Sequence, residues 1–496
     1  MKLHLIGHDE KYAVEQSLLT LFPAERPVYG EVDREADAVW AVITLAEDAE
    51  AVTVTTELCV DGKSETHSYS HPLRGTDYER EGQRRHTIGL SFFGAAKKLL
   101  GIAPAWGSLT GVRPTKVAIA AMAEHGRERA ERVLQDTYFV TPARARLAIE
   151  CAEAGLRAEA ALEPRDISLY VGIPFCPTRC AYCSFVSQSV EKSLALIEPY
   201  LDALCREIED AAAMVRRLGL RVKSFYMGGG TPTTLSAPQM DRLLTALETH
   251  FDLSACAERT IEAGRPDTIT LDKLRVLKDH ATTRVSINPQ SMSDEVLRAI
   301  GRHHTAADIE NAMRMVDEVG FASVNMDLIA GLPQDTVERF RDTLTRVLDF
   351  GTDNITIHTL SLKKGSRITL EQSRIPSPEE VGEMLDFAAP LLRAQDFAPY
   401  YLYRQKYMSG SFENVGWAKP GGECLYNIYI MEELHTILSL GAGGSTKLVD
   451  RKGEYIERVF NHKYPQEYIE RPEKLGSNRE AFAAFYTDRM KGENGK

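Results

Sequence analysis

Long uncharged apolar segments are absent from this chain of 496 residues. Crossing a bilayer takes about 18 to 20 consecutive, largely apolar residues, so no membrane span is expected. Residues 1–16 carry histidines and charged side chains where a secretory signal needs a continuous apolar core. We therefore expect a protein that stays in the cytoplasm.

Positive charge is in short supply, because 59 Lys and Arg stand against 71 Asp and Glu and give a formal net charge of −12. A non-specific nucleic-acid or anionic-membrane binder presents a basic surface, so neither partner is expected. An anionic substrate would need a local basic pocket. The composition, 43% hydrophobic and 26% charged, is that of a globular protein long enough for two or three domains.

Cysteine is scarce, with 8 residues in the whole chain, which is too few for a disulfide scaffold. Three of them, Cys176, Cys180 and Cys183, fall within eight positions. In a cytoplasmic chain such clustering favours metal or redox chemistry. The remaining five are scattered and are most simply small buried hydrophobes: Cys59, Cys151, Cys205, Cys256 and Cys424.

Three regions differ in pattern. Residues 1–165 mix helical periodicity with alternating strand-like runs and predict a small α+β domain whose role the sequence does not reveal. In residues 166–395, six apolar runs alternate with longer amphipathic helices, which implies a parallel sheet in an open or partial barrel. Residues 396–496, rich in Tyr and Gly, indicate an appended C-terminal domain. The six expected strands are 168–173, 224–227, 260–263, 284–287, 323–329 and 355–360.

The three clustered cysteines have CxxxCxxC spacing and directly follow the first expected barrel strand. A barrel of this kind places its active-site loops at the carboxyl ends of its strands. Three thiolates at this spacing can ligate three corners of a [4Fe-4S] cube and leave one iron open to a substrate or cofactor. Structural zinc would need a fourth protein ligand, and no nearby Cys or His follows Cys183.

This loop, with Tyr182 just before the third cysteine, resembles the radical S-adenosylmethionine (SAM) superfamily. The resemblance implies that Cys176, Cys180 and Cys183 hold a [4Fe-4S] cluster and that SAM chelates the open iron. An electron from the cluster would then cleave SAM to methionine and a 5′-deoxyadenosyl radical. Glycines at the end of the second strand would let the backbone approach the ligand closely.

The segments YVGIPFC, GGGTPT, IEAGRPD, NMDLIAGLP, ENVGWAKPGGECLYN and LGAGGSTK resemble the oxygen-independent coproporphyrinogen III dehydrogenases (oxidases) over roughly residues 167–450. The long N-terminal extension and Gly172 are most similar to the HemZ branch of that family. The resemblance implies a radical SAM partial (β/α)6 TIM-like barrel, a coproporphyrinogen-dehydrogenase-like C-terminal region, and one or two SAM molecules. Each charged or polar residue among the implied SAM positions, taken singly, is more simply interpreted as part of a structural ion pair. The implied SAM positions are Tyr170, Tyr182, Gly229, Gly230, Thr231, Glu262, Gln290, Arg302, Asp327, Ser361 and Ser445.

The activity implied by this resemblance is oxidative decarboxylation in haem and porphyrin biosynthesis. Two propionates of coproporphyrinogen III become vinyl groups and give protoporphyrinogen IX, with a reduced flavodoxin- or ferredoxin-type protein as electron donor. A tetra-anionic substrate requires cations, although a solvated surface charge is the simpler interpretation of any one candidate. The candidates are Arg179, Lys363, Lys364, Arg404 and Lys406.

Two positions depart from the better-known dehydrogenase. Phe185 stands where that enzyme has a further cysteine, and Gly172 stands where it has a histidine. Phenylalanine at position 185 is shared with haem chaperones of the HemW type. The alternative to dehydrogenase activity is therefore a haem carrier without turnover. A third possibility is an enzyme that methylates or opens a tetrapyrrole. Among other residues, His303 and His304 are interpreted as a surface pair, and His358 in the sixth strand faces either the core or the pocket.

Overall fold

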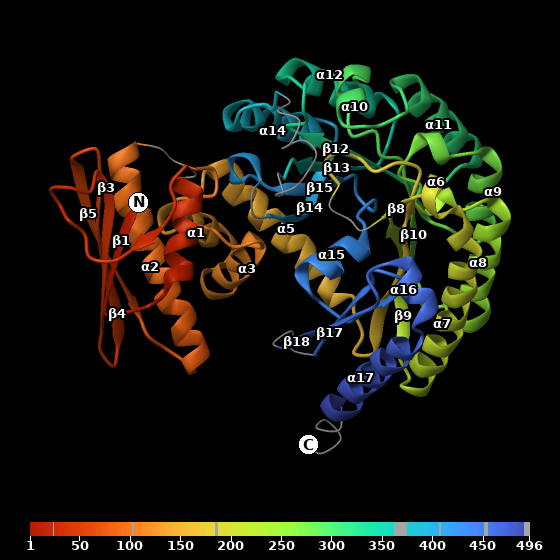
Figure 1. Ribbon diagram of the computed structural model, residues 1–496, viewed down its shortest axis with the longest axis horizontal. Helices are drawn as coiled ribbons and strands as arrows, with labels where there is room; N and C mark the ends of the chain where they lie inside the picture. Colours follow the sequence, from red (N-terminus) through yellow and green to blue (C-terminus); the bar gives the residue numbers. More distant parts are fainter. Residues whose placement is uncertain are drawn as a thin grey trace. The chain divides into compact units, whose positions relative to one another are not determined.

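The computed structural model describes residues 1–22, 24–101, 104–183, 187–361, 374–405, 408–450 and 455–490. It divides into two compact units, residues 1–149 with 410–412 and residues 150–409 with 413–496 (Figure 1). No helix in these described ranges is long and apolar enough to cross a membrane. Four residues singled out from the sequence lie outside the described residues: Phe185, Lys363, Lys364 and Lys406.

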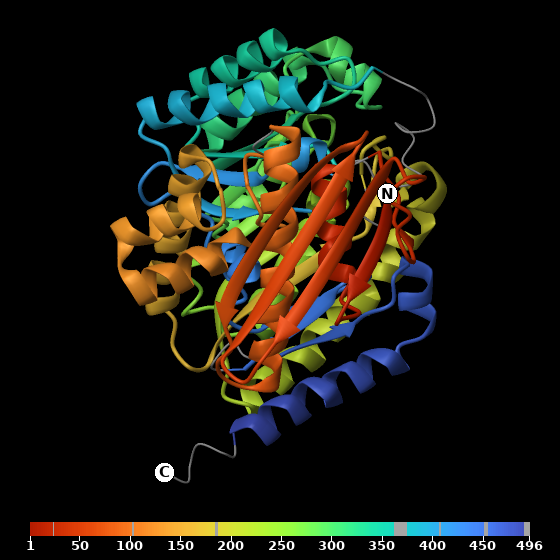
Figure 2. The same cartoon turned by 90° about the vertical axis from the view of Figure 1, so that its left-hand side faces the viewer.

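The first unit contains a five-stranded sheet with the order β2-β1-β3-β4-β5, seen face on in Figure 2. β1 is parallel to both of its neighbours, and β3, β4 and β5 form an antiparallel meander. The strands are β1 (Lys2–Ile6), β2 (Val28–Tyr29), β3 (Val39–Glu47), β4 (Ala51–Val60) and β5 (Lys63–Pro72). The helices are α1 (Lys11–Leu21), α2 (Asp77–Leu100), α3 (Pro114–His125), α4 (Arg127–Asp136) and the first part of α5 (Pro142–Ala160).

This unit has its own hydrophobic core, as an α+β fold requires. In β4, buried Val52 and Val54 alternate with polar Thr53 and Thr55, which is the period of a strand with one covered face. Helix α2, which covers this face, starts with a capping box. The Thr76 side chain accepts a hydrogen bond from the Glu79 amide, and the Glu79 side chain accepts one from the Thr76 amide. Residues of β1, β3, β4, α1 and α2 share a single buried cluster.

The second unit is built on six parallel strands that are neighbours in chain order, as the sequence predicts. They are β6 (Asp166–Ile173), β9 (Arg221–Gly229), β10 (Glu258–Glu262), β11 (Arg284–Ser286), β12 (Ser323–Ala330) and β13 (Asn354–Thr359). Most residues of β6, β11 and β13 are buried, which is typical of parallel strands covered on both faces. The α/β fold class expected from the sequence is confirmed.

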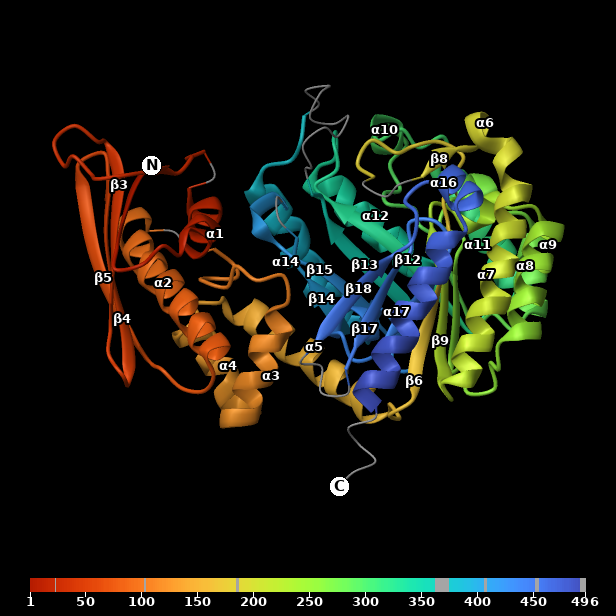
Figure 3. The same cartoon turned by 60° about the horizontal axis from the view of Figure 1, so that its bottom comes forward.

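Long helices follow the parallel strands, and neighbouring helices lie side by side along the sheet, as Figure 3 shows. These helices are α7 (Ile197–Arg217), α8 (Ala237–His250), α9 (Leu271–Asp279), α11 (Ala306–Val319), α12 (Val337–Asp349) and α14 (Pro378–Ala394). Capping boxes at Ser236, Thr305 and Ser377 begin α8, α11 and α14. In each box the capping side chains satisfy backbone groups that the first turn of the helix leaves unpaired.

The last hundred residues extend the same sheet at both edges. β14 (Ala398–Tyr403) and β15 (Asn414–Ala418) continue from β13 in antiparallel fashion. β16 (Ile437–Leu440) lies parallel to β6, and β17 (Ser445–Val449) and β18 (Ile456–Phe460) follow as an antiparallel edge. The described sheet therefore has 11 strands. The helices of this region are α15 (Leu425–Glu432), α16 (Pro465–Glu470) and α17 (Glu473–Met490).

Candidate active site at the carboxyl edge of the parallel sheet

The three-cysteine loop leaves the end of β6 and begins at β7 (Phe175–Cys176), which pairs with β8 (Gln188–Ser189). Cys176 is buried, Cys180 and Cys183 are partly exposed, and none of the three forms a disulfide. The Cys183 amide donates to the carbonyl of Cys180 at 3.2 Å, and the Ala181 amide donates to the carbonyl of Ile300 at 3.0 Å, beyond α10 (Asp294–Ala299). In the described part of the chain, no three His, Cys, Asp or Glu side chains converge as a ready metal site. The loop thus carries the thiols without drawing them into a closed ligand set.

The glycine run at the end of β9 lies directly against this loop. Gly229 has a φ of 113°, which favours glycine, and the Gly230 amide donates to the carbonyl of Ile173 at 2.7 Å. A Cβ at position 230 would lie 2.5 Å from the carbonyl oxygen of Phe175. Glycine therefore allows two backbone segments to touch where a ligand loop must be held.

Thr231 continues this contact to a cluster cysteine. Its amide donates to the carbonyl of Phe175 at 2.8 Å, and its hydroxyl donates to the sulfur of Cys176 at 3.5 Å. Arg265, after β10, brings Nη1 to 3.9 Å from the sulfur of Cys180. Donors to thiolate sulfur offset the negative charge that cluster ligands carry. Three thiols on one loop, two of them with such donors, therefore fit a [4Fe-4S] cluster.

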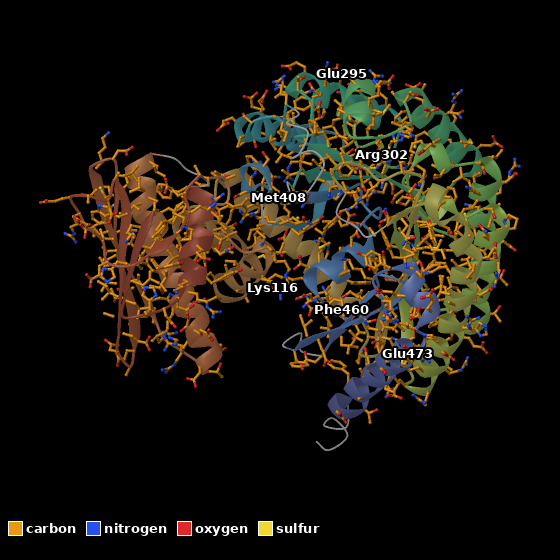
Figure 4. The ribbon with its side chains drawn as sticks, in the orientation of Figure 1. Lys116, Glu295, Arg302, Met408, Phe460 and Glu473 are labelled. Carbon is orange, nitrogen blue, oxygen red and sulfur yellow. The ribbon has the colours of Figure 1, made fainter. Side chains whose placement is uncertain are left out.

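Arg302 and Tyr182 form a polar contact beside the same loop. The Arg302 Nη2 atom donates to the Tyr182 hydroxyl at 2.8 Å, and Nη1 donates to the carbonyl of Gly264 at 3.5 Å. Arg302, labelled in Figure 4, is buried, and its Nε atom has no hydrogen-bond partner. Burial raises the pKa of Tyr182, so its hydroxyl stays protonated. A buried guanidinium with an unused donor suits an anionic or hydroxylated ligand.

Glu262 ends β10 and accepts a hydrogen bond from the hydroxyl of Tyr226 in β9. Burial is the largest cause that raises its pKa, from 4.5 to about 7; the charge of Asp327 adds to this shift. The hydrogen bond from Tyr226 works in the opposite direction. Near neutral pH this carboxyl therefore exists in both protonation states and can donate or accept a hydrogen bond.

Asp327 in β12 behaves differently from Glu262. Burial alone would raise its pKa, but the nearby His358 and the hydrogen bond from Asn325 outweigh burial and lower it. The nearest His358 nitrogen is 3.8 Å away, and the amide nitrogen of Asn325 is at 2.8 Å. His358 thus faces this carboxylate rather than the apolar core. Asp327 stays ionised and accepts hydrogen bonds.

Gln290 follows β11 and is joined to β12 by its backbone. Its amide donates to the carbonyl of Asp327 at 2.9 Å, and its carbonyl accepts from the amide of Ile329 at 3.1 Å. Its φ of 67° lies in the left-handed region. This unusual backbone conformation ties Gln290 to the strand that carries Asp327.

Three further predicted positions, Tyr170, Ser361 and Ser445, lie in β6, after β13 and in β17. Tyr170 in β6 stacks on Tyr226 and Tyr426 at ring-centre distances of 6.2 and 6.1 Å. Ser361 follows β13 and pairs with Met408 in a single β-bridge. Ser445 begins β17, two strands away from Tyr170, which separates it from the carboxylates of β10 and β12.

The backbone around Gly172 leaves little room for a side chain. A Cβ there would lie 3.2 Å from the carbonyl oxygen of Ala442 and 3.6 Å from that of Leu440. The Tyr200 hydroxyl donates to the carbonyl of Gly172 at 2.6 Å and accepts from the amide of Ala442 at 3.0 Å. A side chain at position 172 would therefore be crowded by the turn after β16.

Some residues of the site were missed or misjudged from the sequence. Arg265 was not singled out, although it follows Glu262 in IEAGRPD, and Tyr226 was not singled out, although it lies two positions before the glycine run. The interpretation of His303 and His304 as a surface pair was wrong for one of them. His303 is exposed, but His304 is buried beside Asp267, because the turn after α10 directs it inward.

The chain's parallel sheet, its cysteine loop and its strand-end polar groups together define a radical SAM protein. The Radical SAM superfamily pattern matches residues 170–347, and proteins of this superfamily bind a [4Fe-4S] cluster and SAM. Within it, the chain belongs to the oxygen-independent coproporphyrinogen III oxidase family, in its HemZ branch. It is 36% identical to the oxygen-independent coproporphyrinogen-III oxidase-like protein HemZ of Bacillus subtilis over 95% of each chain.

Two further relatives bracket the range of activities in this family. The haem chaperone HemW of Escherichia coli is 26% identical over 61% of this chain and 76% of its own. The solved structure of coproporphyrinogen III oxidase (HemN) from Escherichia coli, a radical SAM enzyme, superposes with a TM-score of 0.52. It is 27% identical, over 65% of this chain and 73% of that chain.

Proposed function

We propose that this protein converts coproporphyrinogen III to protoporphyrinogen IX by oxidative decarboxylation of two propionates. The main support is that Thr231 and Arg302 both contact the cysteine loop, while Glu262 at the end of β10 lies beside the glycine run that touches this loop. The extended similarity to an oxygen-independent coproporphyrinogen-III oxidase-like protein supports the substrate. A reduced flavodoxin- or ferredoxin-type protein would supply electrons.

Cys176, Cys180 and Cys183 would hold the cluster, and the cluster with SAM would supply the radical chemistry that takes a hydrogen atom from the propionate β-carbon. Each propionate would then become a vinyl group by losing CO₂ and passing one electron to an electron acceptor. Of this chain's own groups, Asp327 accepts hydrogen bonds as a carboxylate. Glu262, with a pKa of about 7, can hold a proton on its carboxyl oxygen. The set proposed to hold one or two SAM molecules is completed by Tyr170, Tyr182, Gly229, Gly230, Thr231, Gln290, Arg302, Ser361 and Ser445.

Two of the five candidate cations for the tetra-anionic substrate, Arg179 and Arg404, lie in the described residues. Arg404 is the better candidate of the two. Arg179 is exposed, whereas Arg404 is buried at the end of β14, and burial lowers its pKa to about 10. A guanidinium with this pKa is still charged near neutral pH. A buried cation of this kind recognises a carboxylate more strongly than a solvated one does.

The decisive experiment reconstitutes the protein anaerobically with iron and sulfide and supplies dithionite, SAM and coproporphyrinogen III. We expect 5′-deoxyadenosine together with a porphyrin that has lost two CO₂. Cys180→Ala should abolish both products. Cys205→Ala, which removes a thiol on α7 that lies outside the cysteine loop, should retain them.

Two other outcomes would overturn the substrate assignment. Deoxyadenosine without a change in porphyrin mass would keep the radical chemistry and exclude decarboxylation of this substrate. Tight haem binding with neither product would favour the haem-carrier function, which the similarity to HemW makes the second candidate.

A further inference from the structure

Arg265 is a buried cation beside the cysteine loop, with 3% of its surface exposed. Its Nε and Nη2 atoms donate to the two carboxylate oxygens of Asp267 at 3.0 and 2.8 Å. Its Nη1 atom donates to the carbonyl and the hydroxyl of Thr178 at 3.1 and 2.9 Å and approaches the Cys180 sulfur at 3.9 Å. One guanidinium therefore joins the turn after β10 to the cysteine loop.

Asp267 is itself held in place from behind. The fully buried ring of His304 brings Nδ1 to 3.8 Å from a carboxylate oxygen of Asp267. Burial opposes ionisation of Asp267, but His304 and Arg265 outweigh it and hold its pKa below the usual range. The bidentate pair therefore keeps the planar guanidinium in a single orientation.

The turn that carries Arg265 is also hydrogen-bonded to the segment that follows the glycine run of β9. Lys273 donates through Nζ to the carbonyl of Thr268 at 2.9 Å and to that of Thr233 at 2.6 Å. The hydroxyls of Thr233 and Thr268 lie 2.6 Å apart. These contacts fix the turn independently of Arg265, so its guanidinium is not needed to shape its own turn.

A purely local role would use only the two nitrogens that bind Asp267. The third nitrogen reaches back across 87 residues to Thr178 and 85 residues to Cys180. Arginine is required for this arrangement, because lysine cannot bind a carboxylate in a fork and still donate to a second segment. The Nη1 atom of Arg265 therefore contacts the cysteine loop rather than its own turn.

We propose that Arg265 is a positioning residue for the cluster, holding the Cys180 segment and placing a positive charge beside its sulfur so that the cluster's reduction potential is raised. The proposal rests on the cysteines being the cluster ligands, as the proposed function has them. It does not depend on the identity of the tetrapyrrole. Hydrogen bonds to sulfur and nearby charge are known determinants of iron–sulfur potentials.

The test is a redox titration of the reconstituted cluster, followed by electron paramagnetic resonance, without SAM or substrate. Arg265→Gln removes a positive charge and should make the potential more negative. Asp267→Asn leaves Arg265 held by Thr178 without its counter-charge and should make the potential less negative. We expect changes of about tenfold in the equilibrium constant of the one-electron reduction, about 59 mV each. Arg284→Gln, which removes a buried guanidinium that binds Gly422, serves as the control and should leave the potential unchanged.

Opposite shifts separate an electrostatic role from a structural one, because general loosening of the loop would move both variants in the same direction. Shifts of the same sign, or no shift in either variant at normal iron content, would overturn the proposal. If Arg265→Gln takes up no iron, Asp267→Asn decides, and an unchanged potential there overturns it too. Full iron content in Cys180→Ala would instead contradict the ligand assignment and so the proposed function.

Discussion

Glu262 and Asp327 carry the same functional group on strands of the same sheet, but they differ in protonation. Glu262 has one hydroxyl donor, from Tyr226, and burial dominates its pKa. Asp327 accepts a hydrogen bond from Asn325 of β12 and faces His358 of β13, and these partners outweigh burial. The partner groups, rather than the residue type, therefore decide which carboxyl carries a charge.

Glu262→Gln should remove a pH dependence of stability. The folded protein holds a proton on Glu262 up to a pKa of about 7, whereas an ordinary glutamate releases it near 4.5. The contribution of this group to the free energy of unfolding is therefore present below pH 4.5 and is lost as the pH rises to about 7. The glutamine variant mimics the neutral carboxyl and should be more stable than the parent at about pH 8, by on the order of 2 kcal/mol.

Chemical denaturation across this pH range would measure the effect. Glu383→Gln, at an exposed position on α14, is the control and should keep the parent's pH profile. An unchanged slope in Glu262→Gln would show that the carboxyl is ordinary.

At the scale of elements, a buried glutamate connects the C-terminal region to the helix after the cysteine loop. Glu207 of α7 accepts from the Gly441 amide at 2.7 Å and from the hydroxyl of Tyr468. Its other oxygen accepts from the Asn461 side chain at 2.9 Å. One side chain thus joins α7 to α16 and to the turns beside β16 and β18.

Glu207→Ala should destabilise this region, because three buried donors lose their acceptor and a cavity remains. We expect a loss of about 3 kcal/mol in the free energy of unfolding. Proteolysis should also become faster within residues 441–490. Glu209→Ala, at an exposed position on the same helix, should change neither measurement. Equal stability of the two variants would mean that the network contributes nothing.

At the scale of the whole molecule, the two units bury separate hydrophobic cores. The first unit's core combines its sheet with α1 and α2, and Phe92 of α2 lies fully inside it. Phe340 of α12 is buried in the second unit. Each unit should therefore respond to loss of its own aromatic side chain.

Phe92→Ala should lower the stability of the first unit by about 3 to 5 kcal/mol. Iron content and SAM binding, which belong to the second unit, should stay at the parent level. Phe340→Ala should have the converse effect. Calorimetry with iron analysis would check both variants, and equal loss of iron would show that the units unfold together.

The six parallel strands could be predicted because short strand-like runs alternate with longer amphipathic helices along the chain. The edge strands β14 to β18 were not predicted one by one. Their pairings are long-range, as when Ile437 in β16 lies beside Ser168 in β6. No local periodicity reports such a contact, because the partner strand is contributed by a distant part of the chain.

The sequence by itself determined the cluster motif, since all three cysteines lie in one short loop whose spacing is visible in one dimension. It also placed Glu262 and Asp327 at the right strands, because strand order and chain order coincide. Only the tertiary structure decided their protonation, the burial of His304 and the reach of Arg265 to Cys180. These properties depend on burial and on partners from distant strands, and both exist only after the sheet has assembled.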